Sequence, residues 1–138
     1  MNLDKLIPQK INFNKSISNH QNLLNANILD SNILVIGGAG TIGSSYIKQV
    51  LKYKPAKITV VDINENGLTE LTRDLRSSNL LDYKPEYITY PVNLMSDTFD
   101  KVFNSETWQV VANFSAHKHV RSEKDKISVE ALIKNNVY

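Results

Sequence analysis

The chain has no cysteine among its 138 residues. This excludes disulfide bonds, cysteine-ligated zinc and thiol nucleophiles, and it fits a protein of the cytoplasm. The chain also has little excess charge, because its formal net charge is +2 and its lysines and arginines are scattered. A surface that binds nucleic acid normally concentrates basic residues in a stripe, so we expect no nucleic-acid partner.

Long apolar runs are missing as well. The longest, Ile33 to Ile36, leads into glycines and is far too short to span a bilayer. The N-terminus does not show the charged and then apolar pattern of a signal peptide, so we predict a cytoplasmic protein without a membrane span. Hydrophobic residues make up 41% of the chain and charged residues 22%, which is typical of a globular domain with a buried core.

Residues 1–31 differ from the rest because they are rich in Asn, Gln, Ser and Lys and poor in apolar residues. Leu23, Leu24 and Ile28 share one face of a short helix expected before Asp30. Two interpretations stay open: an N-terminal arm that packs on the following domain, or a disordered leader.

From residue 32 onward, short apolar runs alternate with helical patterns. Strands are expected over 33–36, 58–61, 87–90 and 108–114. Helices are expected between them, over 96–104, and from about 129 to the end. Strands that alternate with helices form a parallel sheet with right-handed crossovers. We therefore predict an α/β fold of three layers, α/β/α, with about four strands in the order 3-2-1-4.

The first two of these helices have assignable inner faces. The helix after the first strand is expected to bury Ile42, Tyr46, Ile47, Val50 and Leu51, and Pro55 ends the pattern. Asn64 is expected to cap the next helix. That helix is expected to bury Leu68, Leu71 and Leu75.

A glycine-rich segment, Gly37-Gly38-Ala39-Gly40-Thr41-Ile42-Gly43, lies between the first strand and its helix. It satisfies both G-x-G-x-x-G and G-x-x-G-x-x-G. In a dinucleotide site, such glycines allow a sharp turn, close approach of a diphosphate, and close packing of helix on sheet. Free N–H groups at Thr41 and Ile42, at a helix N-terminus, favour the negative charge. The alternative is a plain glycine turn.

Asp62 closes the second strand about 20 residues later, where a carboxylate accepts hydrogen bonds from the hydroxyls of the adenosine ribose. A carboxylate there repels a 2′-phosphate, and Ile63 and Asn64 add no basic residue. The sequence therefore predicts a Rossmann-type doubly wound NAD(P)-binding domain over 32–138, incomplete and preceded by the arm 1–31, with NAD favoured over NADP.

These residues resemble a known family. The stretch ILVIGGAGTIGSSYIKQVLKYKPAKITVVDINENGLTELTRDLR is similar to the start of extended short-chain dehydrogenase/reductases. Within that group the chain resembles the nucleotide-sugar 4,6-dehydratases and epimerases of bacterial polysaccharide biosynthesis. That family has a run such as HAAALKHVP and a later TNV, and here NFSAHKHV and Asn135-Asn136-Val137 stand in these places. The resemblance covers residues 32–138.

The resemblance implies roles for named positions. The residues that it places around the diphosphate are Gly37, Gly40, Thr41, Ile42 and Gly43. Asp62, with Ile63 and Asn64 after it, would hold the adenosine ribose. Asn93 and Leu94 would lie near the adenine. The residues that it places near the nicotinamide ribose and the active site are Phe114, Ser115, Ala116, Lys118 and Asn136. Phe114 and Ser115 replace small alanines of the family.

The family's catalytic Tyr-x-x-x-Lys pair follows a fifth strand that this sequence does not reach, so we assign no catalytic residue and do not expect this chain alone to run the reaction. Tyr53 and Lys57 have the same spacing, but Pro55 lies between them and they precede a strand, so we reject them. His117 and His119 are interpreted as loop residues beside the cofactor, because no third metal ligand is in view.

Three hypotheses follow from this sequence. The first is the NAD-binding part of a nucleotide-sugar dehydratase or epimerase, with a nucleotide-sugar substrate in the complete enzyme. The second is a non-catalytic NAD-binding module or degenerate remnant, and the third is a remnant in which Phe114 blocks the site. A longer reading frame with Tyr-x-x-x-Lys would favour the first. The free edge of the fourth strand also predicts self-association.

Overall fold

The computed structural model describes residues 13–116 and 125–137. Its helices are α1 (Phe13–Asn19), α2 (Gln21–Ile28), α3 (Thr41–Val50), the 3-10 turn η2 (Leu51–Tyr53), α4 (Glu65–Ser77), α5 (Asp97–Asn104) and α6 (Lys126–Val137). Its strands are β1 (Asn32–Ile36), β2 (Lys57–Val61), β3 (Glu86–Tyr90) and β4 (Val110–Asn113). No helix in these two ranges combines the length and the apolar character that a membrane crossing needs.

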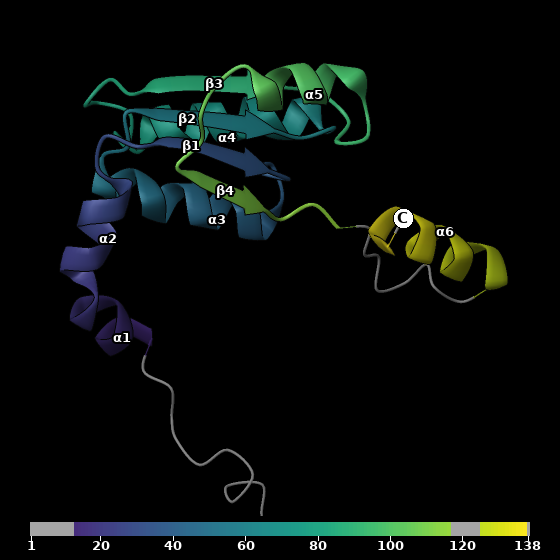
Figure 1. Ribbon diagram of the computed structural model, residues 1–138, viewed down its shortest axis with the longest axis horizontal. Coiled ribbons are helices and arrows are strands. Elements are labelled where there is room, and N and C mark those ends of the chain that lie inside the picture. The colour runs from purple at the N-terminus through teal and green to yellow at the C-terminus, as the bar shows by residue number, and fades with distance from the viewer. Residues whose placement is uncertain (1–12, 117–124, 138) are drawn as a thin grey trace, which may run out of the picture.

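The four strands form one parallel sheet in the order β3-β2-β1-β4, which confirms the predicted order (Figure 1). β1 and β2 lie in the middle and are almost wholly buried, as their continuous β-branched and leucine runs require. Their alternate side chains face opposite sides of the sheet. The first two strands therefore divide the core into two halves.

Helices cover both faces of the sheet. One face carries α3 and α4, and its buried core contains Ile33, Val35, Ile58, Val60, Ile47, Val50, Leu51, Leu68, Leu71 and Leu75. The other face carries α5, and its smaller core contains Leu34, Ile36, Val61, Phe99 and Val102. The three-layer α/β/α architecture and the inner face of α4 are thus as predicted.

The prediction that Ile42 faces the core is wrong, because 71% of its surface is exposed. Ile42 lies in the first turn of α3, directly after the glycine loop that follows β1. The rest of the predicted face is correct, with Ile47, Val50 and Leu51 buried and Tyr46 half-buried. The spacing of apolar residues alone did not show that the side chain of Ile42, in the first turn of α3, lies outside the core.

Two boundaries also differ from the prediction. β4 begins at Val110 rather than at 108, because Trp108 packs on the smaller core and its indole N–H donates to the carbonyl of Phe103 at 2.8 Å. α6 begins at Lys126 rather than near 129, since the Asp125 carboxylate accepts from the N–H groups of Ile127 and Ser128. A local side-chain contact sets each boundary.

The described part of the N-terminal arm is helical. α2 reaches the body of the domain through Ile28, which packs against the larger core, and α1 extends away from it (Figure 1). α6 lies apart from the sheet at the other side (Figure 1). Its apolar residues Ile127, Val129 and Ile133 are exposed.

Candidate dinucleotide-binding site

The glycine loop starts with a tight turn over the end of the sheet. Gly37 has a φ of +72°, a conformation that favours glycine. Its N–H donates to the carbonyl of Val61 at 2.8 Å, and a Cβ there would lie 2.6 Å from the backbone nitrogen of Ser115. The turn therefore passes directly between the ends of β2 and β4.

Two other glycines of the loop are required by packing. A Cβ on Gly38 would lie 2.3 Å from Cγ1 of Val60, and a Cβ on Gly43 would lie 2.4 Å from the carbonyl oxygen of Gly37. Both contacts are far closer than van der Waals distance. These glycines bring the first turn of α3 against the sheet, as the motif predicts.

Gly40 is different, because nothing in the described structure requires it to be glycine. A Cβ there would meet only the carbonyl oxygen of Gly37, at an ordinary 3.5 Å. Its φ of −72° and ψ of 166° suit any residue. The backbone of Gly40 is therefore open on the side where a Cβ would stand, and we call this open space the cradle.

The N-terminus of α3 opens at the same place. Gly40 is its N-cap and offers no side-chain acceptor. Within the described residues, the N–H groups of Thr41, Ile42 and Gly43 have no hydrogen-bond acceptor. Unpaired donors at a helix N-terminus suit an anion.

The carboxylate of Asp62 lies beside this loop. Its Oδ2 accepts from the N–H of Ala39 at 2.9 Å, and its Oδ1 accepts from the N–H of Asn64 at 2.9 Å. Asn64 in turn caps α4, because its Oδ1 accepts from the N–H of Gly67 at 3.0 Å. Ile63 projects outward with 75% of its surface exposed.

After β3 and after β4, as after β2, the side-chain oxygen of an Asp or Asn accepts from the backbone N–H two residues further on. The side-chain oxygen of Asn93 accepts from the N–H of Met95 at 2.9 Å, and that of Asn113 accepts from the N–H of Ser115 at 2.9 Å. Asp62 bonds Asn64 in the same way, so an Asx turn redirects the chain after three of the four strands. The sequence signal was an Asp or Asn at the end of these three strands or shortly after it, and we did not use Asn113.

Phe114 packs inward. Its ring lies against that of Tyr46, with centroids 5.1 Å apart, and it joins the larger core. Its N–H donates to the carbonyl of Ile36 at 2.8 Å. Burial raises the pKa of Tyr46. The large side chain at this position is therefore used in packing between β4 and α3.

The remaining residues predicted to bind the cofactor do not all lie at the glycine loop. Leu94 is half-buried against the smaller core, and Ser115 and Ala116 are exposed after β4. Lys118, like His117 and His119, lies outside the described residues. Asn136 falls in α6, which the structure does not bring to the glycine loop (Figure 1). Among the described residues no cluster of potential metal ligands exists.

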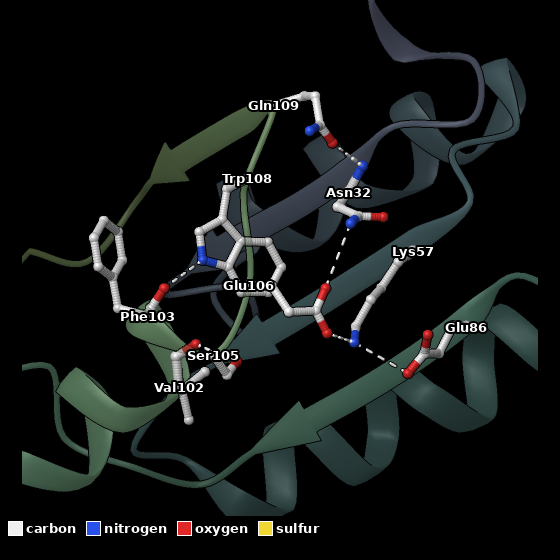
Figure 2. A network of polar contacts seen from close by, with 9 residues as sticks. All are labelled: Asn32, Lys57, Glu86, Val102, Phe103, Ser105, Glu106, Trp108 and Gln109. Atoms are coloured by element: carbon white, nitrogen blue, oxygen red, sulfur yellow. Dashed lines mark hydrogen bonds and ion pairs between the residues drawn. The ribbon is translucent and has the colours of Figure 1, made fainter.

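A network of polar side chains lies at the amino ends of the strands, opposite the glycine loop (Figure 2). Lys57 is 8% exposed and its ammonium group pairs with Glu106 and, at 3.0 Å, with Glu86. The hydrogen bond that the Lys57 ammonium group donates to the Glu106 carboxylate is the main cause of the raised pKa of Lys57. Tyr53 ends η2 and Lys57 begins β2, so this pair does not share a helix, as expected. This lysine joins strands and lies far from the glycine loop.

A parallel sheet in this order, with a glycine loop after its first strand and an acidic residue after its second, defines a Rossmann-type fold. Residues 33–138 match the family model described as polysaccharide biosynthesis protein. The chain belongs to this family, which confirms the resemblance read from the sequence.

Known proteins of two kinds are similar to the chain. The capsular polysaccharide biosynthesis protein CapD of Staphylococcus aureus is 29% identical over 99 residues, which are 71% of this chain and 16% of CapD. An uncharacterized membrane protein of Methanocaldococcus jannaschii is 47% identical over 51 residues, which are 37% of this chain and 15% of that protein. The chain thus spans less than a fifth of the length of either relative.

Among solved structures, Pen from Bacillus thuringiensis superimposes with a TM-score of 0.63 at 28% identity, over 80% of this chain and 32% of Pen. WbmF of Bordetella bronchiseptica, solved in complex with NADH, superimposes with a TM-score of 0.57 at 20% identity, over 79% of this chain and 29% of WbmF. The likeness to WbmF shows a shared fold.

Proposed function

We propose that the chain is the NAD-binding part of a nucleotide-sugar 4,6-dehydratase or epimerase of bacterial polysaccharide biosynthesis. The observation that carries this proposal is the cradle at Gly40, which the protein's own packing does not require, beside three unpaired N–H groups. The similarity to CapD, a capsular polysaccharide protein, supports the pathway. WbmF was also solved with NAD+ and UDP, which supports the cofactor and a nucleotide-sugar partner.

The residues of this chain would bind and orient the cofactor. The N–H groups of Thr41, Ile42 and Gly43 would donate to the diphosphate. Asp62 would accept from the adenosine ribose and repel a 2′-phosphate, which favours NAD over NADP. When bound, the nicotinamide takes up a hydride and returns it. The inward packing of Phe114 supports an open site and speaks against the hypothesis that this ring blocks it.

A substitution at Gly40 tests this proposal. Gly40→Ser adds a side chain in the cradle, and its hydroxyl oxygen can accept from an N–H of the first turn of α3, where serine is a favourable N-cap. We expect the free energy of unfolding in urea to stay within about 0.5 kcal/mol of the wild type. We expect calorimetry to show at least a roughly tenfold loss of NAD+ affinity, because both the space and a donor are taken. Unchanged affinity would contradict the proposed diphosphate position.

The non-catalytic module remains the second candidate, because the sequence contains no Tyr-x-x-x-Lys besides Tyr53 and Lys57. Sequencing the gene on both sides of the segment that encodes this chain separates the two candidates. A downstream Tyr-x-x-x-Lys in the same frame favours the enzyme. A stop codon directly after Tyr138 favours the module.

A further inference from the structure

We infer that Asp62 is also a positioning residue for the diphosphate, because its carboxylate fixes the glycine loop in addition to any contact with ribose. This inference rests on the proposed NAD site and deepens it. The side chain of Asp62 then has two roles, one toward the ribose and one toward the diphosphate. A ligand that lacks the ribose hydroxyls can separate them.

The first observation is that both carboxylate oxygens are bound to backbone. Oδ2 accepts from the N–H of Ala39 in the glycine loop, and Oδ1 accepts from the N–H of Asn64 before α4, each at 2.9 Å. Bonds to an ionised acceptor are stronger than bonds between neutral groups. One side chain at the end of β2 therefore holds two backbone segments that are 25 positions apart in sequence.

The second observation is that Ala39 is also held from the side of α4. A Cβ built on Gly67 would lie 3.0 Å from Cβ of Ala39, so the bare backbone of Gly67 allows the loop to lie against the first turn of α4. The cap from Asn64 to the N–H of Gly67 fixes that turn. Ala39 is therefore held at its N–H by Asp62 and at its side chain by α4.

The consequence for the diphosphate follows from the position of Ala39. It directly precedes Gly40, which is the N-cap of α3 and forms the cradle. Ala39 is half-buried, so losing its acceptor would leave a partly buried N–H unpaired and favour a shift of the loop. A shift of Ala39 moves Gly40 and the donors that follow it.

The two roles of Asp62 do not compete for the same electrons. Each carboxylate oxygen has two lone pairs, and the described hydrogen bonds use one on each. The other lone pairs remain for hydroxyl donors of a ribose. An asparagine at position 62 keeps the shape but has an NH2 group in place of one oxygen, so the N–H of either Ala39 or Asn64 would face a donor instead of an acceptor.

Binding of a modified ligand separates the roles. We would titrate the wild-type chain and Asp62→Asn with NAD+ and with its analogue that carries 2′,3′-dideoxyadenosine, which has no hydroxyls for Asp62. The exposed Asp82→Asn makes the same charge change as a matched control. We expect Asp62→Asn, but not Asp82→Asn, to weaken binding of the analogue at least about tenfold. Equal affinity of wild type and Asp62→Asn for the analogue would overturn the inference, because it would leave Asp62 with the ribose alone.

Amide hydrogen exchange tests the loop without any ligand. We expect the N–H of Ala39 to be protected in the wild type and in Asp82→Asn, and to exchange at least about tenfold faster in Asp62→Asn while the core strands remain protected. Unchanged exchange at Ala39 would overturn the inference. If the wild type does not bind NAD+, the proposed function fails, and the exchange result still decides whether Asp62 fixes the loop. Asp62→Glu, which keeps the charge and moves the oxygens, serves if Asp62→Asn does not fold.

Discussion

Single residues of the glycine loop serve different purposes, and substitutions separate them. Gly43→Ala would place a Cβ 2.4 Å from the carbonyl oxygen of Gly37, in a turn that is fixed from both sides. We expect it to lower the free energy of unfolding by about 2 kcal/mol, as overpacking does. Urea unfolding checks this, and Gly40→Ser is the comparison. Equal stability of the two variants would show that the loop is looser than described.

Tyr83 predicts a loss of stability in alkali. Its phenol donates to the carbonyl of Pro55 at 3.1 Å, and burial raises its pKa from 10.0 to about 12. Below pH 10 the phenol is protonated in both states, so its contribution is complete. Between pH 10 and about 12 the unfolded chain loses the proton first, so stability falls.

The measurement for Tyr83 is urea unfolding at a series of pH values from 8 to 11.5. Lys57, Tyr46 and Tyr87 also have raised pKa values, so the wild type should lose stability over the alkaline range from several groups. Tyr83→Phe removes one of them, and its curve should fall less steeply above about pH 10. Parallel curves for the two proteins would contradict the assignment.

The structural role of a single residue could be predicted from the sequence where it depends only on neighbouring residues. Asp62 at the strand end and Asn64 as a cap are local features, and the structure has both. The contact between Ala39 and Asp62 was not predictable, because it joins segments that meet only in the folded sheet. The exposure of Ile42 was missed for the same reason.

At the scale of elements, Lys57 connects the starts of the strands. It begins β2, and it pairs with Glu86 at the start of β3 and with Glu106 before β4 (Figure 2). Glu106 also accepts from the side chain of Asn32 at the start of β1, at 3.4 Å. Lys57→Met leaves Glu106 without its cation, so we expect a loss of about 2 kcal/mol in urea unfolding.

Two further variants test whether the unpaired charge of Glu106 causes this loss of stability. Lys57→Met combined with Glu106→Leu removes the unpaired charge, so most of the lost stability should return. Glu86→Gln changes a carboxylate that is 60% exposed, and we expect an effect below about 1 kcal/mol. A double variant no more stable than Lys57→Met alone would mean that side-chain packing, not the charge, explains the loss.

The types and the order of the strands and helices after residue 32 followed from hydrophobic patterning, because β1, β2 and α4 bury regular apolar faces. The first and last residues of these elements were predicted less accurately from the patterning. The start of β4 depends on how Trp108 packs, and the start of α6 depends on Asp125. In the arm, α1 has too few apolar residues for periodicity to reveal it.

At the scale of the whole molecule, β4 forms one edge of the sheet. Within the described residues it pairs only with β1, and Val111 on it is 47% exposed. An unpaired apolar edge invites another chain, so we predict self-association of the purified chain. Light scattering at rising concentration should show a growing mass, and Val111→Lys should reduce it. Leu23→Lys, on the arm, is the matched control, and a strictly monomeric wild type would contradict the prediction.

The central claim is that this molecule holds NAD at the glycine loop, and a calorimetric titration of the purified chain with NAD+ and with NADP+ tests it most directly. We predict saturable binding of NAD+ and at least about tenfold weaker binding of NADP+, because Asp62 repels the 2′-phosphate. Binding of neither nucleotide, or equal binding of both, would contradict it.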